Sequence, residues 1–166
     1  MLLLAVDPGL ANTGLTLFEN RRIVDARTLK TTADGPRPGF AACVERSESL
    51  CAQLRIYRAE IGEVATLVAE AYADIPGRLR AVRNRWTTPL AIGLMVPALR
   101  DFTVDGRIIW QDPSVVMTQY AQHVRMWELG QRGLIAGDAC LRNEHQRSAA
   151  AHGMFYLDHA RQAVRT

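Results

Sequence analysis

The chain begins with a short apolar run that ends on one acid. Residues 2–6 are all apolar, and Asp7, Pro8 and Gly9 follow directly. A run of this length that stops at a Pro-Gly turn predicts a buried strand with one carboxylate at its carboxyl end. A buried lone charge needs a partner, and a divalent cation is one such partner. An exposed Asp7 that only starts the turn is the alternative.

Strand and helix patterns alternate along the rest of the chain. Further strands are expected at 14–19, 22–29, 65–72 and 107–110, and helices at 40–62, across 90–99, from 113 onward and from 144 through 160. The strand–helix–strand order predicts a crossover, so that strand 65–72 runs parallel to the first strand. Parallel neighbours would bring Glu70 to the sheet edge that carries Asp7. Glu70 paired with an arginine is the alternative.

The last helix has a marked start and one polar face. Asn143 and Gln146 form a capping-box pattern, which predicts that the helix begins just after Asn143. His145, Ser148 and His152 are spaced three and then four positions apart, so they share one face of the helix. We expect this face to meet the sheet edge. An exposed first-turn position for His145 and a packed, hydrogen-bonded one for His152 are the alternatives.

The composition is that of one soluble domain. The 166 residues are 48 % hydrophobic and 22 % charged, which fits a single domain over residues 1–166. No apolar run approaches the roughly 18 residues of a membrane span, and no export signal is recognisable, so we expect a cytoplasmic protein. The three cysteines are an odd number without metal-site spacing, which favours reduced thiols.

Basic residues are almost all arginines. Lys30 is the only lysine among the 20 basic residues, and the net charge is +3. Arginine suits bidentate contacts with phosphate, although a GC-rich genome also raises the arginine content. Together with the small size, this usage suggests a bacterial or phage-infected cell as the source.

The densest basic cluster comes shortly after Glu70. It consists of four arginines with an adjacent tryptophan: Arg78, Arg80, Arg83, Arg85 and Trp86. A basic stretch interleaved with an aromatic suits phosphate contacts and base stacking, and a solvated helix face is the alternative. Tyr72 could stack on an exposed base or only pack against its neighbours. Arg147, near the start of the last helix, completes the candidate DNA contacts.

Three motifs carry a resemblance to a known family. The stretch Ala5–Gly14 (AVDPGLANTG) resembles the opening of the RuvC-type Holliday-junction resolvases, whose first strand ends in Asp-Pro-Gly with Thr-Gly shortly after. The strand that ends at Glu70, with Tyr72 beyond it, is similar to the family's second motif. Asn143–Ala149 (NEHQRSA) resembles the C-terminal helix motif of phage members, and Ser148 stands where an acid is expected.

The resemblance implies an RNase H-like α/β fold with a five-stranded mixed β-sheet flanked by α-helices. It also implies a homodimeric endonuclease that resolves four-way junctions and other branched DNA by paired nicks. The cofactor would be Mg²⁺, with Mn²⁺ as a substitute. Two divalent ions about 3.5–4 Å apart activate the attacking water and neutralise charge on the phosphate.

Five residues are implied as catalytic. Asp7 would bridge both ions, Glu70 would hold one, and His145 would complete the other shell or deprotonate the water. His145 would act together with Glu144 or Ser148, and because Ser148 replaces the second acid, a second ion requires that Glu144 substitutes or that water fills the gap. A nuclease for RNA–DNA hybrids or forks and a catalytically inactive DNA-binding protein remain open. A sugar-kinase-like ATPase is disfavoured by the chain length.

Overall fold

The computed structural model describes residues 1–31, 39–71, 87–120, 133–137 and 139–163. The strands are β1 (Leu2–Asp7), β2 (Asn12–Glu19), β3 (Arg22–Lys30), β4 (Thr66–Glu70) and β5 (Ile109–Gln111). The helices are α1 (Phe40–Ile61), α2 (Thr87–Arg100), α3 (Pro113–Tyr120) and α5 (Glu144–Ala163).

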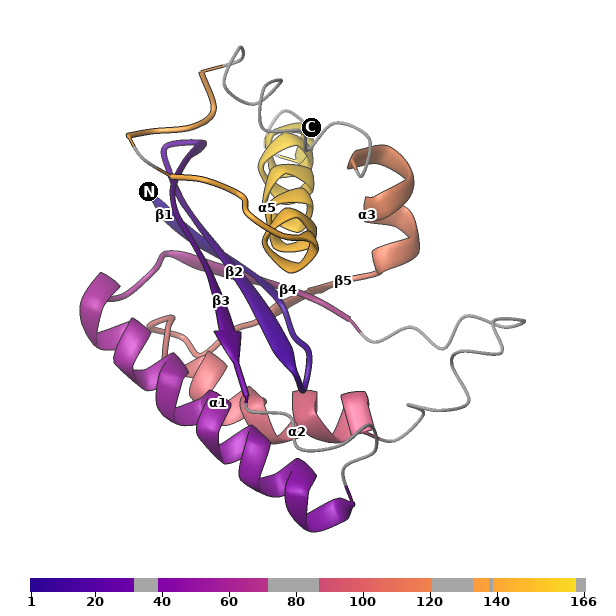
Figure 1. The fold of residues 1–166 in the computed structure, drawn as a ribbon. Coiled ribbons are helices and arrows are strands. Elements are labelled where there is room, and N and C mark those ends of the chain that lie inside the picture. Colours follow the sequence, from indigo (N-terminus) through magenta and orange to yellow (C-terminus); the bar gives the residue numbers. More distant parts are fainter. Residues whose placement is uncertain (32–38, 72–86, 121–132, 138, 164–166) are drawn as a thin grey trace.

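One mixed sheet organises these elements (Figure 1). Its strand order is β3-β2-β1-β4-β5, in which β1, β2 and β3 form an antiparallel meander. The turn between β2 and β3 has left-handed backbone angles at Asn20 and Arg21, as a tight hairpin turn requires. Helix α1 carries the chain across to β4, which pairs in parallel with β1. The five-stranded mixed sheet and the parallel crossover are therefore confirmed.

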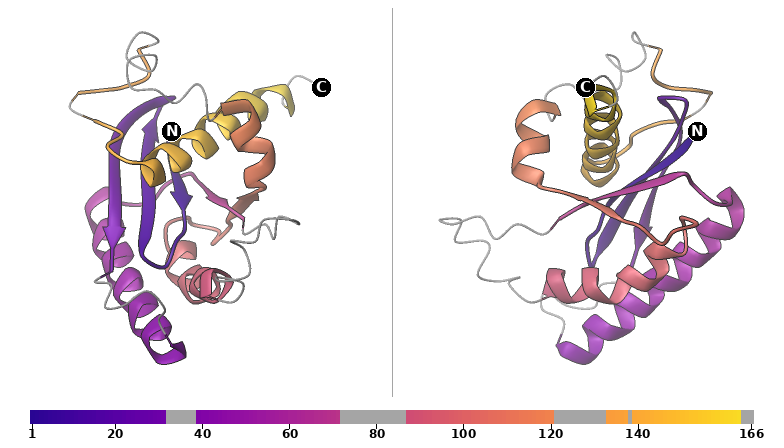
Figure 2. Two further views of the ribbon diagram at one scale, coloured as in Figure 1. Left: turned by 45° about the vertical axis from the view of Figure 1, so that its right-hand side comes forward. Right: turned by 180° about the vertical axis from the view of Figure 1, so that it is seen from behind.

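Helices cover both faces of the sheet (Figures 1 and 2). Helices α1 and α2 lie on one face, and α3 and α5 lie on the other. Successive strand residues point to opposite faces. Leu4 and Val6 pack in the core of the α1 side, whereas Leu3 and Ala5 pack in the core of the α5 side. Asp7 follows Leu3 and Ala5 in this alternation, so it belongs to the α5 face.

Helix α5 lies directly on the sheet because small residues line its contact face. Ala149 and Ala150 are fully buried there. At Gly153 a Cβ would lie 2.2 Å from a ring carbon of Phe18, so only glycine fits at this position. The Oγ of Thr16 donates a hydrogen bond to the carbonyl oxygen of Gln146 at 3.0 Å. These contacts fix both the height and the direction of α5 over β1 and β2.

Most element boundaries agree with the sequence patterns. Gly62 ends α1 with a positive φ of 77°, and Asp112 accepts the Ser114 backbone N–H at 2.8 Å as the cap of α3. Strand β5 differs, since it covers 109–111 rather than 107–110. The reason is a local turn in which the Arg107 N–H donates to Asp105 at 3.0 Å.

Helix α2 packs against α1 with one face and leaves part of its apolar surface exposed. Ala91, Met95 and Leu99 are buried in the core beside α1, while Leu94 is 38 % exposed.

Within the described ranges, no helix is both long and apolar enough to cross a membrane.

Candidate active site

Two acids end neighbouring parallel strands. Val6 pairs with Ala69 in the parallel register of β1 and β4, so the next residues, Asp7 and Glu70, lie side by side. Both point to the α5 face by the strand alternation. Their side chains are 16 % and 25 % exposed, respectively. The sheet therefore presents two partly buried carboxylates at one edge.

Side-chain hydrogen bonds hold the start of α5 at this edge. The side-chain oxygen of Asn143 accepts the Gln146 backbone N–H at 3.1 Å, as the capping box predicts. The Asn143 amide also donates to Thr28 on β3 at 2.7 Å. The Gln146 side chain accepts from the Arg142 N–H, one residue before the expected partner, and donates to Ala26. The first turn is thereby tied to β3.

Gly14 allows this first turn to reach Asp7. Gly14 is the antiparallel partner of Asp7 on β2. A Cβ at this position would lie 2.1 Å from the carbonyl oxygen of His145, which no side chain could tolerate. The missing side chain thus leaves the space that α5 occupies next to the acid.

The face of α5 predicted from the sequence meets both acids. The Nδ1 atom of His145 lies 3.0 Å from Oδ2 of Asp7. The Oγ of Ser148 donates to Oε2 of Glu70 at 2.9 Å. Each acid is therefore held by one residue of the helix, at the spacing of one helical turn.

Two residues that the sequence analysis did not assign to the site complete it. The Nδ1 atom of His152 lies 2.8 Å from Oε1 of Gln111, and its Nε2 atom lies 3.3 Å from Oε2 of Glu70. His152 is fully buried, as the packed alternative predicts. The signals in the sequence were the helical spacing of His152 and the polar Gln111 at the end of β5, where it pairs with Glu70.

The surroundings shift the pKa values of the two acids in different directions. Burial raises the pKa of Asp7, and the neighbouring Glu70 charge adds to the rise, while the hydrogen bond with His145 only partly offsets it. Burial acts in the same direction on Glu70, but the contacts with His152 and Ser148 outweigh it and lower the pKa of Glu70. The pKa values of the two neighbouring carboxyl groups are thus shifted in opposite directions, upward for Asp7 and downward for Glu70.

His145 responds to the same charges. Its hydrogen bond with Asp7 raises the pKa of the imidazole above its ordinary value, against the opposing effect of burial. The imidazole is therefore protonated more readily than that of an unpaired histidine. Protons bound by Asp7 and His145 would balance the negative charge of the acid pair.

The residues suit a divalent cation, although they are bonded to one another. Among the described residues, no three His, Cys, Asp or Glu side chains form a ready-made ion site. Burial and the neighbouring Glu70 charge nevertheless raise the pKa of Asp7, so a positive charge at this position would stabilise the ionised acid pair. A cation can displace the balancing protons, and carboxylate oxygens are the ligands that Mg²⁺ and Mn²⁺ prefer. Asp7, Glu70 and His145 supply that donor set.

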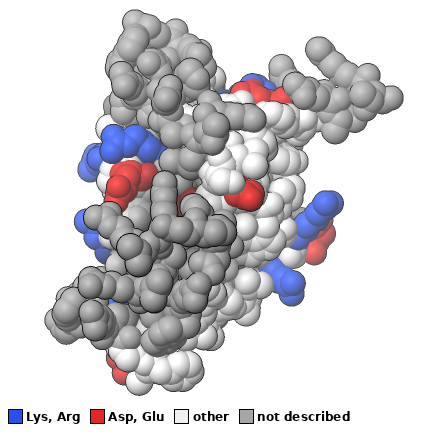
Figure 3. Space-filling model, turned by 90° about the vertical axis from the view of Figure 1, so that its right-hand side faces the viewer, with Lys and Arg blue, Asp and Glu red and all other residues white. Residues whose placement is uncertain are grey.

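The other candidate residues lie away from the acids or outside the description. The Glu144 side chain is 86 % exposed, with its carboxylate 3.9 Å from Nε2 of His145. Arg147 is exposed on the first turn of α5. The remaining candidate DNA contacts lie outside the described residues: Tyr72, Arg78, Arg80, Arg83, Arg85 and Trp86. On the face shown in Figure 3, the described basic side chains are scattered and do not form one patch.

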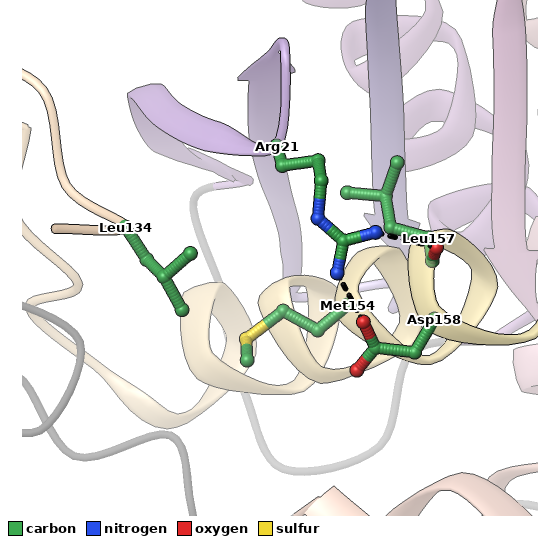
Figure 4. A pocket seen from close by; sticks show the side chains of 5 residues that line it. All are labelled: Arg21, Leu134, Met154, Leu157 and Asp158. Carbon is green, nitrogen blue, oxygen red and sulfur yellow. Dashed lines mark hydrogen bonds and ion pairs between the residues drawn. The ribbon is translucent and has the colours of Figure 1, made fainter. Parts of the chain in front are cut away.

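A pocket near the other end of α5 is not a second site (Figure 4). It is lined by Arg21, Leu134, Met154, Leu157 and Asp158. Arg21 donates to the Leu157 carbonyl oxygen at 2.7 Å and pairs with Asp158, which also accepts from Tyr120. Its charged groups therefore bind each other and link the β2–β3 turn, α3 and α5.

Known structures share this fold, whereas sequence comparisons find no match. No protein-family model and no curated protein sequence matches the chain. RuvC from Thermus thermophilus, in complex with a Holliday-junction substrate, has a TM-score of 0.71 at 18 % identity, covering 98 % of this chain and 96 % of that chain. A second Thermus thermophilus RuvC structure gives 0.65 at 18 % identity, covering 98 % and 97 % of the two chains.

A more distant neighbour is the yeast mitochondrial Holliday-junction resolvase Ydc2. It gives a TM-score of 0.56 at 14 % identity over 92 % of this chain and 74 % of that chain. The chain thus has the RuvC-like form of the RNase H-like fold, as its sequence motifs predict.

Proposed function

We propose, from this RuvC-like fold and the paired acids, that the protein is a divalent-metal-dependent endonuclease that cuts four-way junctions and other branched DNA. One observation carries the proposal. Asp7 and Glu70 end adjacent parallel strands, and His145 and Ser148 of α5 contact them at 3.0 and 2.9 Å. This arrangement places two carboxylates and an imidazole together, where a phosphodiester could be bound and hydrolysed.

The proposed metal ligands are Asp7, Glu70 and His145. Mg²⁺ or Mn²⁺ held there would supply the Lewis acidity that activates water and stabilises the leaving oxygen. Ser148 orients Glu70 through its hydrogen bond and contributes no charge. Glu144 remains a candidate for the outer part of the shell, since its carboxylate is near Nε2 of His145.

His145 is suited to move a proton. Its Nδ1 atom is engaged with Asp7, and its side chain is 30 % exposed, so the ring is both oriented and accessible. As the alternative to ligating the metal, His145 would accept a proton from the attacking water through Nε2, once the ring is in its neutral form. In this role Asp7 fixes the ring and stabilises the imidazolium that forms.

The proposed substrate is branched DNA, and the proposed assembly is a homodimer. Thermus thermophilus RuvC, with which the chain shares its fold, is described in complex with a Holliday junction. Two symmetric nicks in one junction require two active sites related by a two-fold axis. The arginine-rich segment that includes Arg78, Arg80, Arg83, Arg85 and Trp86 remains the proposed DNA contact, with Tyr72 and Arg147.

Cleavage of labelled DNA tests the proposal. A four-way junction, a fork, a linear duplex and an RNA–DNA hybrid would be incubated with Mg²⁺ or Mn²⁺. The proposal predicts paired nicks in the junction, which Asp7→Asn and Glu70→Gln each abolish. Asp101→Asn and Glu63→Gln change exposed acids away from the site and are expected to cleave like wild type.

A branched-DNA-binding protein without activity is the second candidate. Ser148 favours it, because this residue stands at a position where the resemblance implies an acid. That function predicts junction binding that survives Asp7→Asn and no cleavage of any substrate with either metal. Preferential cleavage of the hybrid or the fork would instead identify that nucleic acid, and not the four-way junction, as the preferred substrate.

A further inference from the structure

His152 is a buried titratable residue with no role in the chemistry described so far. It is completely buried, beneath the face of α5 that carries His145 and Ser148. Its neighbours on the helix are small apolar residues, such as Ala149 and Ala151, that pack on the sheet. An imidazole in such surroundings requires partners for both ring nitrogens, since buried polar atoms are rarely left unpaired.

Gln111 provides one of these partners and fixes the ring. The Nδ1 atom of His152 lies 2.8 Å from Oε1 of Gln111. This contact fixes the orientation of the ring, and which atom donates follows from the ring tautomer. Gln111 is itself held in the sheet, because its carbonyl oxygen accepts the Ala71 N–H at 2.8 Å and its backbone pairs with Glu70.

The other ring nitrogen is directed at Glu70. The Nε2 atom lies 3.3 Å from Oε2 of Glu70, yet it has no aligned hydrogen bond among the described residues. A small rotation of the carboxylate would align this contact. The ring is anchored from behind by Gln111, so the carboxylate is the group that has to turn.

Ser148 engages the same carboxylate oxygen. Its Oγ donates to Oε2 of Glu70 at 2.9 Å, from the residue one helical turn before His152. Two groups from α5 thus converge on a single oxygen of Glu70. Such convergence restrains the carboxylate through Oε2 and leaves Oε1 for another partner.

We propose that His152, anchored by Gln111, is a positioning residue that holds Oε2 of Glu70 so that the carboxylate offers its other oxygen to a divalent cation shared with Asp7. The inference rests on the proposed metal site. In this chain, hydrogen bonds from Ser148 and His152 orient Glu70. They take over part of the role that an acid at position 148 would have as a metal ligand. Removal of a residue that hydrogen-bonds to a metal ligand typically lowers metal affinity or activity by roughly 10–100-fold.

Mn²⁺ binding to the full-length protein without DNA tests the inference, because it does not depend on catalysis. Calorimetric titration of His152→Leu should show roughly tenfold or greater weakening. His152→Gln should recover most of the affinity, because its amide can donate to Glu70 from a similar place. His159→Leu is the matched control: His159 lies on the same helix but bonds to the Phe155 carbonyl oxygen, and wild-type affinity is expected.

A second variant tests the inference if His152→Leu does not fold. Gln111→Leu removes only the anchor of the ring and should weaken Mn²⁺ binding in the same direction. The double variant Gln111→Leu/His152→Leu should be no weaker than His152→Leu, because both changes break one chain of contacts. Thermal melting of each variant identifies those that fold, and Gln111→Leu decides the question if His152→Leu does not.

Three results would overturn the inference. Wild-type affinity in folded His152→Leu, or in Gln111→Leu if that variant alone folds, would show that Glu70 needs no such support. Failure of His152→Gln to recover any affinity would indicate that His152 is itself a ligand. A wild-type protein that binds no Mn²⁺ and cuts no DNA would instead reject the proposed function on which the inference rests.

Discussion

The backbones of Gly14 and His145 are in direct contact, so that a Cβ on residue 14 would lie 2.1 Å from the His145 carbonyl oxygen. Gly14 pairs with Asp7 across the sheet, and His145 contacts Asp7 through its ring. The absence of one side chain therefore determines how close the helix comes to the first acid.

Gly14→Ala should displace the first turn of α5. We expect the free energy of unfolding to fall by roughly 1–3 kcal/mol or more, since the new methyl group meets backbone atoms that cannot rotate away. Mn²⁺ binding should weaken as well, because His145 is displaced from Asp7. Chemical denaturation and calorimetry measure the two effects.

Gly93→Ala is the control for this substitution. Gly93 lies inside α2 with no atom near the position of a new Cβ. Alanine should be neutral or should stabilise the helix by up to about 1 kcal/mol. Equal stability of Gly14→Ala and Gly93→Ala would contradict the close approach.

Metal binding should release protons. The pKa values of Asp7 and His145 are both raised, and a metal ligand must be deprotonated. Apparent Mn²⁺ affinity should therefore rise with pH until both groups have lost their protons, and should fall as the pH drops through the raised pKa values. Titrations in two buffers of different ionisation enthalpy would count the protons released. The same heat in both buffers would contradict the prediction.

Asp7→Asn should make the metal-free protein more stable at alkaline pH. A raised carboxyl pKa means that the folded state holds a proton longer than the unfolded state, so stability falls as pH rises from the ordinary to the raised value. Removing the charge removes this loss. His145 is neutral at alkaline pH, so its ion pair with Asp7 does not offset the gain.

Denaturation of wild type and Asp7→Asn at several pH values, with a chelator present, measures this effect. The stability difference should shrink toward acid pH, where Asp7 of the wild type is protonated. Excess Mn²⁺ should reverse the order, because only the wild type gains binding energy from the ion. A less stable Asp7→Asn at alkaline pH would contradict the raised pKa.

Ser148→Asp should lower the stability of the metal-free protein and raise its affinity for the metal ion. The new carboxylate would lie against Glu70, where the Ser148 hydroxyl now donates at 2.9 Å. Loss of the donor and repulsion between two acids should destabilise the metal-free protein by about 1–3 kcal/mol. The additional charge should strengthen Mg²⁺ binding and raise the cleavage rate at limiting Mg²⁺.

Ser148→Ala separates the two effects, because it removes the donor without adding charge. It should lose stability and gain no metal affinity. If Ser148→Asp binds Mg²⁺ no better than Ser148→Ala does, the acid position inferred from the sequence is not part of the metal site.

The acid pair could be predicted from sequence because it depends on local signals and one general rule. Apolar runs that end on Asp7 and Glu70 define the two strands, and the preference for right-handed crossovers makes the strands parallel. The start of α5 was equally clear, since Asn143 and Gln146 have the spacing of a cap. Helical spacing then gave the face that carries His145 and Ser148.

The part of the site around His152 could not be predicted in the same way. Its partner Gln111 lies at the end of a three-residue strand whose bounds a nearby turn shifts by two residues at its start and one at its end. The contact depends on the register of β5 and on how α5 rests on the sheet. Gly14 and Gly153 determine how closely α5 approaches the sheet. Glycines do not contribute to a hydrophobic pattern, so the sequence pattern does not predict this distance.

Mapping of nicks in a four-way junction labelled separately on each strand tests the central claim most directly. With Mn²⁺ or Mg²⁺, the wild-type protein should make two nicks at symmetry-related positions, and Asp7→Asn should make none while still binding the junction. An intact junction with either metal, together with junction binding and no calorimetric metal uptake, would contradict the account and leave a DNA-binding protein of this fold.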